Sequence, residues 1–322
     1  MEEHRGLPEG SQVAGYRLER EVGRGDTSVV YRAKDLRLGR TVALKLISPE
    51  LQRDDAFRRR LVRDTRIAAA IDHPNILPIF EADETDGVLY FAMRYVPGPD
   101  LRVVLDQEGP LPVATALRIA AQVASALDAA HEHDLVHRDV KPANILVAGG
   151  ADGDHPEHVY LTDFGLTQES LSHRTLDYMA PEQISGSPVD GRCDLYSLAC
   201  VVYETIAGGP PFERGGDMAL LWAHQYDPPP ALSERRPGIA PGVDAVMAKA
   251  LAKRPEDRYA SCLEFVAALR SAASPDPTSM HPPSHASMPD PIPPPASPSF
   301  PLGGSNESTP PGPPFDDDDD EW

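Results

Sequence analysis

Four polar residues near the middle of the chain have the types and spacing for nucleotide chemistry. Asp139, Lys141 and Asn144 lie close together, and Asp163 follows a short distance along the chain. Carboxylate and amide oxygens are the hard ligands that Mg²⁺ prefers in proteins. A lysine beside them supplies a positive charge for a phosphate group. This set therefore indicates a site for a nucleotide and its metal ion.

Two short apolar runs are expected to position these polar residues. Residues 145–147 and 159–161 are apolar, and the stretch 148–158 between them is rich in Gly, Asp and His. This pattern predicts two short strands joined by a loop. Asp139, Lys141 and Asn144 precede the first strand and Asp163 follows the second. We therefore expect the four residues to meet at the ends of the two strands.

A hairpin and a lysine-bearing strand are predicted nearer the N-terminus. Residues 16–22 and 29–33 alternate between apolar and polar types, as strands do. The turn 23–28 between them contains glycines that allow close approach of a ligand, although an ordinary hairpin would look the same. Lys45 follows on a strand at 41–46, and further strands are predicted at 76–80 and 88–93. Because only five of the 30 basic residues are lysines, a lysine here and at 141 indicates that a compact ammonium is required.

An amphipathic helix is predicted at residues 54–71. Phe57, Leu61, Ala68 and Ile71 share one face, and arginines occupy the others. Asp64 falls on the apolar face. An unpaired buried carboxylate there is costly, so we expect it to have a cationic partner.

The string HRDVKPAN at 137–144, followed by DFG at 163–165, resembles the catalytic loop and metal-binding motif of eukaryotic-type (Hanks-type) protein kinases. The resemblance extends over about residues 16–270. It is strongest to bacterial Ser/Thr kinases of the actinobacterial kind. It implies an α+β fold with two lobes, a small antiparallel β-sheet lobe with one main helix and a larger, mainly α-helical lobe.

The resemblance also implies catalytic roles. Lys45 holds the α- and β-phosphates of ATP, while Asn144 and Asp163 hold Mg²⁺, with Mn²⁺ as a possible substitute. Lys141 steadies the γ-phosphate, and Asp139 orients and deprotonates the acceptor hydroxyl.

Further residues acquire roles by the same resemblance. Asp64 stands where the family has a glutamate that pairs with Lys45, and Ser28 stands at the third glycine of the phosphate loop. Adenine is expected between apolar residues such as Val30 and Ala43, with the hinge between the lobes at 94–96. The implied nucleotide-binding residues are Gly23, Arg24, Gly25, Ser28, Val30, Ala43, Lys45, Met93, Tyr95, Val96, Asn144 and Asp163.

The later motifs match the same family. Residues 178–182 resemble the end of an activation segment, in which Thr175 belongs to the substrate-binding turn. The helix 194–206 matches the central buried helix of the larger lobe. Asp194 is expected to brace the catalytic loop, and Arg258 to pair with Glu182. The short segment between the motifs offers three hydroxyls for phosphorylation, on Thr167, Ser170 and Ser172.

Composition narrows the possible partners and compartment. The formal charge is −20, of which residues after 270 supply −9, so the body is also acidic and nucleic acid is not expected as a partner. We expect no signal peptide, because residues 1–10 lack its basic and apolar pattern. We expect no membrane span, because the longest apolar candidate, around 198–206, is too short. The cysteines form no close pair, so neither a disulfide framework nor a zinc site is indicated, and a reducing cytoplasm fits.

Two histidines end the predicted helix 113–133. His131 and His133 could suggest a metal, but side chains two residues apart on a helix do not face one way. A solvated helix end is therefore the preferred interpretation.

The chain divides by composition. Residues 1–15 are an N-terminal extension, 16–272 the kinase domain (lobes 16–96 and 97–272), and 273–322 a tail rich in Pro and Ser with an acidic end. The tail is predicted to be disordered, because it holds too little apolar surface to offset the entropy of ordering. It either recruits a partner or serves only solubility.

The function predicted from these motifs is transfer of the γ-phosphoryl group of ATP to Ser or Thr hydroxyls of protein substrates, including autophosphorylation. Two alternatives remain open. One is a catalytically impaired kinase fold that acts as a binding or scaffold module, motivated by Ser28, Asp64 and the short activation segment. The other is a small-molecule phosphotransferase of related fold.

Overall fold

The computed structural model describes residues 7–25, 28–48, 55–149, 157–164 and 173–274. All of them belong to one compact unit that ends at Pro275. Side chains of residues 55–57, 173 and 174 are not described.

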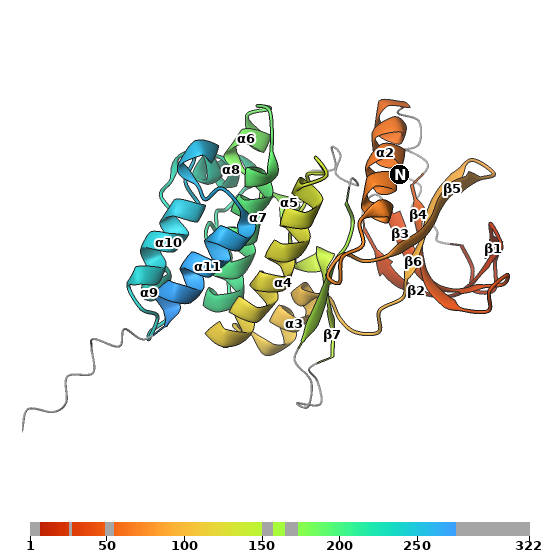
Figure 1. Ribbon diagram of the computed structural model, residues 1–322, viewed down its shortest axis with the longest axis horizontal. Helices are drawn as coiled ribbons and strands as arrows, with labels where there is room; N and C mark the ends of the chain where they lie inside the picture. The colour runs from red at the N-terminus through yellow and green to blue at the C-terminus, as the bar shows by residue number, and fades with distance from the viewer. Residues whose placement is uncertain (1–6, 26–27, 49–54, 150–156, 165–172, 275–322) are drawn as a thin grey trace, which may run out of the picture. The chain divides into compact units, whose positions relative to one another are not determined.

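The N-terminal part is a six-stranded antiparallel sheet (Figure 1). Its strand order is β1-β2-β3-β4-β6-β5, and every neighbouring pair runs antiparallel. The strands are β1 Gln12–Val13, β2 Tyr16–Arg24, β3 Ser28–Asp35, β4 Thr41–Ile47, β5 Ile79–Thr85 and β6 Val88–Arg94. The strands predicted at 16–22, 29–33 and 41–46 are confirmed.

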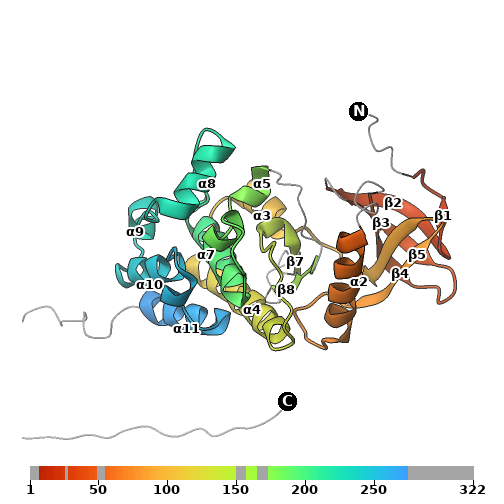
Figure 2. The same ribbon diagram turned by 90° about the horizontal axis from the view of Figure 1, so that it is seen from above.

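Strand β4 is buried on both of its faces. Val42, Leu44 and Leu46 pack into one apolar cluster, and Ala43 and Ile47 into another. Successive strand residues point to opposite faces, so Lys45 lies on the same face as Ala43. That face packs against helix α2 (Asp55–Ala70) through Leu61, and Figure 2 shows α2 beside the sheet. Lys45 is 5% exposed in this setting.

The segment 76–80, predicted as a strand, is only partly one. Strand β5 begins at Ile79, whereas Ile76 forms an isolated bridge to Leu161, to whose carbonyl Leu77 donates at 3.0 Å. Pro78 separates the two parts because it has no N–H to continue a ladder. The residues before Pro78 therefore connect the sheet to the second lobe.

The second lobe is mainly helical and carries a small hairpin. The hairpin strands are β7 Ile145–Ala148 and β8 His158–Leu161, as predicted. The α-helices are α3 Leu101–Glu108, α4 Val113–His131, α5 His173–Leu176, α6 Pro181–Ile184, α7 Gly191–Ala207, α8 Asp217–Tyr226, α9 Leu232–Arg235, α10 Gly242–Ala250 and α11 Cys262–Ala273, with short 3₁₀ helices η1 Pro142–Asn144 and η2 Pro255–Asp257.

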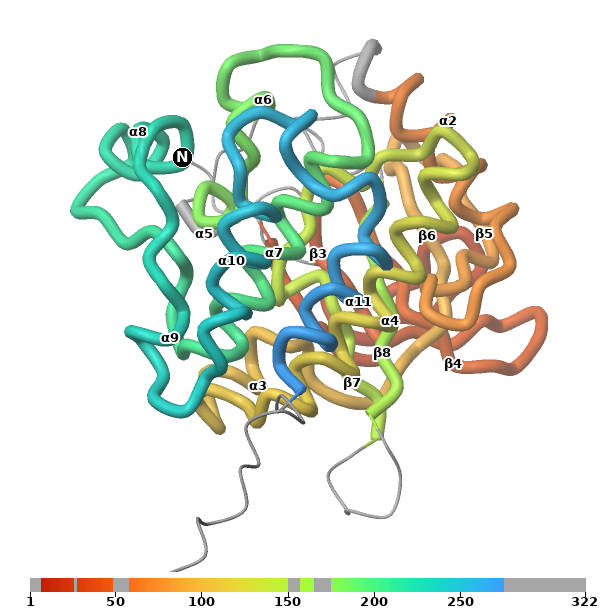
Figure 3. Tube along the Cα trace, turned by 60° about the vertical axis from the view of Figure 1, so that its left-hand side comes forward, coloured from red at the N-terminus to blue at the C-terminus, as the bar shows by residue number. Residues whose placement is uncertain are grey.

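Helix α7 is the centre of this lobe. Its residues from Cys193 to Ile206 are all buried, as predicted for 194–206. It packs against α4, α10 and α11, and Figure 3 shows α11 running alongside α4. Helix α4 is long and apolar enough to cross a membrane, but buried core helices meet the same two criteria. Its apolar face packs against α7, α11 and β8 in this fold.

A buried ion pair ties α6 to the segment after η2. Arg258 donates through Nη1 and Nη2 to the two carboxylate oxygens of Glu182, at 2.7 and 2.8 Å. Its Nε donates to the Ala252 carbonyl at 2.8 Å, and its guanidinium lies over the Tyr196 ring. The predicted pairing is confirmed. A bidentate pair with its remaining donors satisfied is the favourable form of a buried ion pair.

Removing one partner of this pair should strongly destabilise the fold. Arg258→Ala would leave Glu182 as an uncompensated buried charge, which costs about 3–5 kcal/mol of unfolding free energy. Arg254→Ala is the matched control, because Arg254 pairs with Glu256 at the surface, where both side chains are over half exposed. That variant should lose less than about 1 kcal/mol. Equal losses in urea denaturation would contradict this account of the Arg258 pair.

His224 on α8 is a buried histidine kept neutral by its surroundings. It is fully buried, its Nδ1 lies 3.0 Å from the Tyr196 hydroxyl, and the Phe212 ring meets it edge-on. Burial, together with the nearby Lys253 ammonium, lowers the pKa of His224 to about 3. The folded protein therefore resists protonation at a position where the unfolded chain does not.

His224 should make stability depend on pH between about 6.5 and 3. Below about 6.5 the unfolded chain binds a proton that the folded chain refuses, so stability falls as pH falls, by up to about 1.4 kcal/mol per pH unit. In His224→Gln this contribution is absent. Denaturation curves of both proteins from pH 7.5 to 4 should diverge only at the acid end, in favour of the variant. Parallel stability profiles would show that His224 does not titrate in this way.

Candidate active site

Three of the predicted catalytic residues form one hydrogen-bonded group before β7. The Asn144 side-chain amide, held by η1, donates to the backbone carbonyl of Asp139 at 2.7 Å and to its Oδ2 at 3.0 Å. Lys141 Nζ lies 2.8 Å from the same Oδ2 and donates to Thr175 Oγ1 at 3.1 Å. The structure thus brings Asp139, Lys141 and Asn144 together with Thr175 of the substrate-binding turn.

Lys45 and Asp163 form an ion pair that links the sheet to the residue following β8. Lys45 Nζ lies 2.7 Å from Asp163 Oδ2. Although desolvation acts to raise it, the Lys45 ammonium holds the pKa of Asp163 below its usual value, and His137 and Lys141 act in the same direction. Asp163 is therefore an ionised carboxylate that contacts the Lys45 ammonium and is also stabilised by the charge of Lys141. The two lysines singled out by the sequence both act on it.

The expected pairing of Asp64 with Lys45 is wrong for this conformation. Asp64 is only 5% exposed, and its predicted cationic partner exists, but that partner is Arg63, whose Nη2 lies 2.8 Å from Asp64 Oδ1. Among the described residues, Lys45 makes its ion pair with Asp163. Thr65 of α2, not Asp64, lines the cavity beside Lys45. Consecutive helix residues point about 100° apart, so the rotation of α2 decides which of them faces the lysine.

Asp194 braces the catalytic loop, as predicted. Its Oδ2 accepts from His137 N at 2.8 Å, and its Oδ1 accepts from Arg138 N at 2.7 Å. Arg138 has a φ of 68°, a left-handed conformation that is unfavourable for a side chain of this type. The two hydrogen bonds hold the backbone in this form just before Asp139. Asp163 also has a positive φ, of 72°, which aspartate tolerates better.

His131 also binds Asp194, so the interpretation of a solvated helix end is wrong for this residue. Its Nε2 lies 2.8 Å from Asp194 Oδ2. Although burial alone would lower it, Asp194 and further carboxylates raise the pKa of His131. His133 is exposed, with Nδ1 3.0 Å from the Ala129 carbonyl. The partner of His131 comes from a distant helix, and its position could not be read from the local pattern.

The predicted adenine-binding residues lie together. Ala43 and Met93 are cross-strand neighbours in β4 and β6, and Val30 is paired with Lys45 in β3 and β4. Val30, Tyr95 and Val96 pack on the buried cluster that contains Ala43 and Met93. Strand β6 ends at Arg94, so Tyr95 and Val96 begin the irregular segment between the lobes, at the predicted hinge.

Gly98 shapes the chain just after this hinge, which the sequence did not single out. Its φ is 141°, and a β-carbon there would lie 2.4 Å from the Val147 carbonyl oxygen. Val147 N donates to the Pro99 carbonyl at 2.9 Å. A glycine is therefore needed for the hinge segment to pack closely on β7.

The predicted phosphate loop joins β2 and β3. Gly23 and Arg24 end β2, Gly25 N donates to the Ser28 carbonyl at 2.9 Å, and Ser28 begins β3 as a buried residue. Among the described residues, no atom lies within 4 Å of the place that a β-carbon at Gly25 would take. The loop tip at 26–27 and the hydroxyls of Thr167, Ser170 and Ser172 lie outside the described residues.

The donor set fits a hard divalent cation. The Asn144 amide nitrogen is used by Asp139, which leaves the amide oxygen for a ligand, and Asp163 supplies a carboxylate. Phe164 fixes the end of this motif by packing on the His137 ring, with centroids 4.6 Å apart. His137 Nε2 in turn lies 2.8 Å from the Thr162 carbonyl.

Comparison with known proteins identifies the family. The family described as "Protein kinase domain" matches residues 16–268. This chain belongs to the protein kinase family. It is 44% identical to the serine/threonine-protein kinase PknE of Mycobacterium tuberculosis over 273 residues, which are 82% of this chain and 47% of PknE. It is 42% identical to PknH of the same organism over 281 residues, 84% of this chain and 44% of PknH.

A solved structure shows the same fold. The PknI kinase domain of M. tuberculosis is 37% identical, with a TM-score of 0.70, covering 83% of this kinase and all of that chain. The predicted two-lobed fold is thereby confirmed. This kinase spans about half the length of the curated relatives that it matches.

Proposed function

We propose that this kinase transfers the γ-phosphoryl group of ATP to Ser and Thr hydroxyls of proteins in bacterial signalling, itself included. The observation that carries the proposal is the hydrogen-bonded group of Asp139, Lys141 and Asn144 beside Thr175. These residues supply a base, a cation and a metal ligand within one short loop. The names of the relatives, serine/threonine-protein kinases, support the same activity.

Asp139 is the proposed base. Its Oδ2 contacts Lys141 and Asn144, whereas Oδ1 makes neither of these contacts and is available to the proton of an acceptor hydroxyl. Lys141 contacts Asp139 and Thr175, so it can place a positive charge near the γ-phosphoryl group while the acceptor lies beside the base. Holding both partners in one geometry supplies much of the catalysis in phosphoryl transfer.

Asn144 and Asp163 are the proposed ligands of Mg²⁺, or of Mn²⁺. Such an ion, when bound, neutralises charge on the phosphate oxygens of ATP. Gly23, Arg24, Gly25 and Ser28 are proposed to cover the phosphates. Adenine is proposed to lie against the apolar residues Val30, Ala43, Met93, Tyr95 and Val96. Of these, Ala43 and Met93 belong to one buried cluster, and the other three are partly buried and pack against it.

Lys45 is proposed to exchange partners during the catalytic cycle. In this conformation it is bound to Asp163, and Asp64 is bound to Arg63. In the working state Lys45 holds the α- and β-phosphates and Asp64 holds Lys45, which leaves Asp163 for the metal ion. A rotation of α2 by about one residue position would bring Asp64 to the place of Thr65. The two arrangements are then states of one equilibrium, which ATP shifts.

The proposal extends to domains, partners and location. The kinase domain is taken as residues 16–272, with an N-terminal extension at 1–15 and a tail at 273–322 that recruits a partner or aids solubility. We propose neither a membrane-spanning segment in this chain nor a nucleic acid as its partner. A cytoplasmic location is supported by Cys193, Cys200 and Cys262, which are buried and free of disulfides in the described part of the chain.

Replacing Asp139 should abolish most turnover without unfolding the protein. Asp139→Asn keeps the shape of the side chain but cannot take a proton, so turnover should fall by about 10²–10⁴. Nucleotide affinity and melting temperature should stay close to those of the wild type. The measurements are phosphate incorporation from labelled Mg-ATP and binding of a fluorescent ATP analogue.

Asp134→Asn is the matched control for that experiment. Asp134 lies outside the group, is exposed, and has a φ of 55°, which asparagine also accepts. It should leave turnover unchanged. A folded Asp139→Asn protein with full turnover would remove the basis of the proposed function.

If Lys45 exchanges partners, substitutions of two neighbouring residues on α2, Asp64 and Arg63, should affect turnover differently. Asp64→Ala removes the carboxylate needed in the working state, so turnover should fall at least about tenfold, which corresponds to about 1.4 kcal/mol. Arg63→Ala removes only the partner that Asp64 has in this conformation, so turnover should be unchanged or higher. The measurements are kcat and KM for ATP. If Asp64→Ala has no effect, Asp64 is structural and Lys45 works without it.

A further inference from the structure

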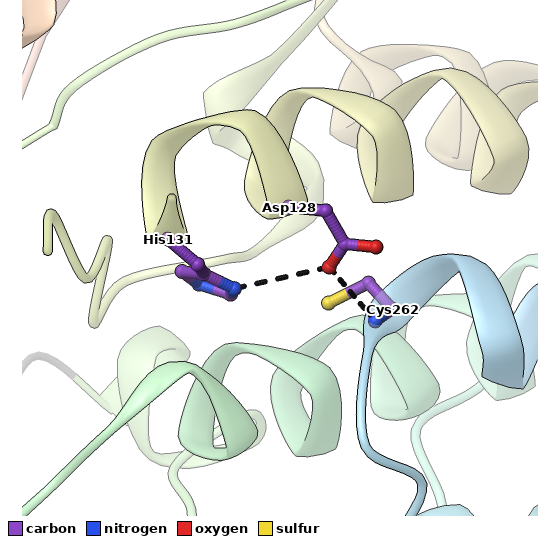
Figure 4. Close-up of side chains that lie close together, drawn as sticks. All are labelled: Asp128, His131 and Cys262. Atoms are coloured by element: carbon purple, nitrogen blue, oxygen red, sulfur yellow. Dashed lines mark hydrogen bonds and ion pairs between the residues drawn. The ribbon is translucent and has the colours of Figure 1, made fainter. Parts of the chain in front are cut away.

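A cluster of three potential metal ligands lies away from the candidate active-site residues. Asp128 and His131, one turn apart on α4, face Cys262, the first residue of α11 (Figure 4). One atom from each residue, a carboxylate oxygen, an imidazole nitrogen and the thiol sulfur, lies within 4.8 Å of the others. We call this group the α4–α11 cluster. This cluster could not be predicted from the sequence, because Cys262 is far from Asp128 and His131 along the chain.

The imidazole of His131 is oriented as in protein zinc sites. Its Nε2 lies 2.8 Å from Asp194 Oδ2, so in the neutral ring Nε2 carries the proton and donates it to the carboxylate. Nδ1 then has a free lone pair, and it lies 3.9 Å from Asp128 Oδ1. In that neutral tautomer Nδ1 and Oδ1 turn lone pairs toward each other, and a proton or a metal cation between them would satisfy both groups. A carboxylate behind a histidine is the usual support of a metal-binding imidazole.

Asp128 is also held by a second layer of hydrogen bonds. Its Oδ1 accepts from Cys262 N and its Oδ2 from Leu263 N, each at 2.9 Å. These bonds cap the N-terminus of α11 and fix the plane of the carboxylate. Capping alone explains Asp128. The Cys262 side chain also hydrogen-bonds to this carboxylate, so the thiol and the His131 imidazole both lie at Asp128.

Cys262 completes the group with a soft ligand. Its thiol is fully buried, and burial, together with the carboxylates of Asp128 and Asp194, raises the pKa of Cys262 well above 9. Its ligand atom lies within 4.8 Å of those of Asp128 and His131, so one ion could contact all three side chains. The Asp128 and His131 side chains are 16% and 19% exposed, so solvent reaches the group from one side.

We propose that Asp128, His131 and Cys262 bind a Zn²⁺ ion, with water as the fourth ligand. Zn²⁺ accepts sulfur, nitrogen and oxygen together in tetrahedral sites, whereas Mg²⁺ and Ca²⁺ bind oxygen almost exclusively. The ion joins α4 to α11. It also fixes the His131 tautomer that donates to Asp194, the residue that braces the catalytic loop.

Cobalt substitution tests the site in the full chain. A Co²⁺-bound thiolate absorbs strongly in the near ultraviolet, and the candidate active site, as far as it is described, contains no cysteine. Absorbance is therefore expected in the wild type and lost in Cys262→Ser. Cys200→Ser is the matched control, since Cys200 is an equally buried thiol on α7 outside the cluster. Competition titration should show at least about tenfold weaker Zn²⁺ binding in Cys262→Ser alone.

A second measurement avoids dependence on the folding of a variant. X-ray absorption at the zinc edge of the wild-type protein, loaded with one equivalent, should show one sulfur ligand at about 2.3 Å. A shell of nitrogen and oxygen only would overturn the proposal, because it would place the ion at other carboxylates. Cobalt–thiolate absorbance that persists in Cys262→Ser, or that is absent from the saturated wild type, would overturn it as well.

Discussion

The buried carboxylate of Asp194 is the interaction on which the site depends. It accepts from the backbone N–H groups of His137 and Arg138 and is bonded to the imidazole of His131. Desolvation acts to raise its pKa, but His131 and the further hydrogen bonds hold the pKa of Asp194 below its usual value. A buried charge is stable only with such partners. Asp194 therefore links α7, α4 and the catalytic loop and keeps Arg138 in its strained backbone conformation.

The second determining feature is competition for one lysine. Lys45 is buried on the α2-facing side of β4 and pairs with Asp163, which follows β8. Under the proposed function, Asp64 of α2 is its second partner. In this conformation Asp163 holds the lysine and Arg63 holds Asp64. Each of these four charged side chains thus has a partner of opposite charge. Under the proposed function, a nucleotide bound to Lys45 would compete with Asp163 for the ammonium. It would thereby shift the population between the two pairing states.

Several strands and the grouping of the catalytic-loop residues could be predicted from local patterns, whereas the two-lobed fold and the roles of the site residues came from the family resemblance. Alternation along β2 and β3, and the apolar runs of β7 and β8, gave correct strands, because each pattern acts within a few residues. The proximity of Asp139, Lys141 and Asn144 followed from their position in one loop. The strand predicted at 76–80 failed because Pro78 interrupts the ladder and Leu77 pairs with the other lobe instead.

What the sequence by itself determined is the family, the identity of the polar residues in the catalytic loop and the burial of Asp64. All three depend on residue types and on their spacing along the chain. Only the tertiary structure decided that Asp64 binds Arg63, that His131 binds Asp194, and that Cys262 meets Asp128 and His131. These pairings depend on the rotation of α2 and on the packing of α4 against α7 and α11. A rotation of about 100° moves a contact from one helix residue to the next, and no local pattern records it.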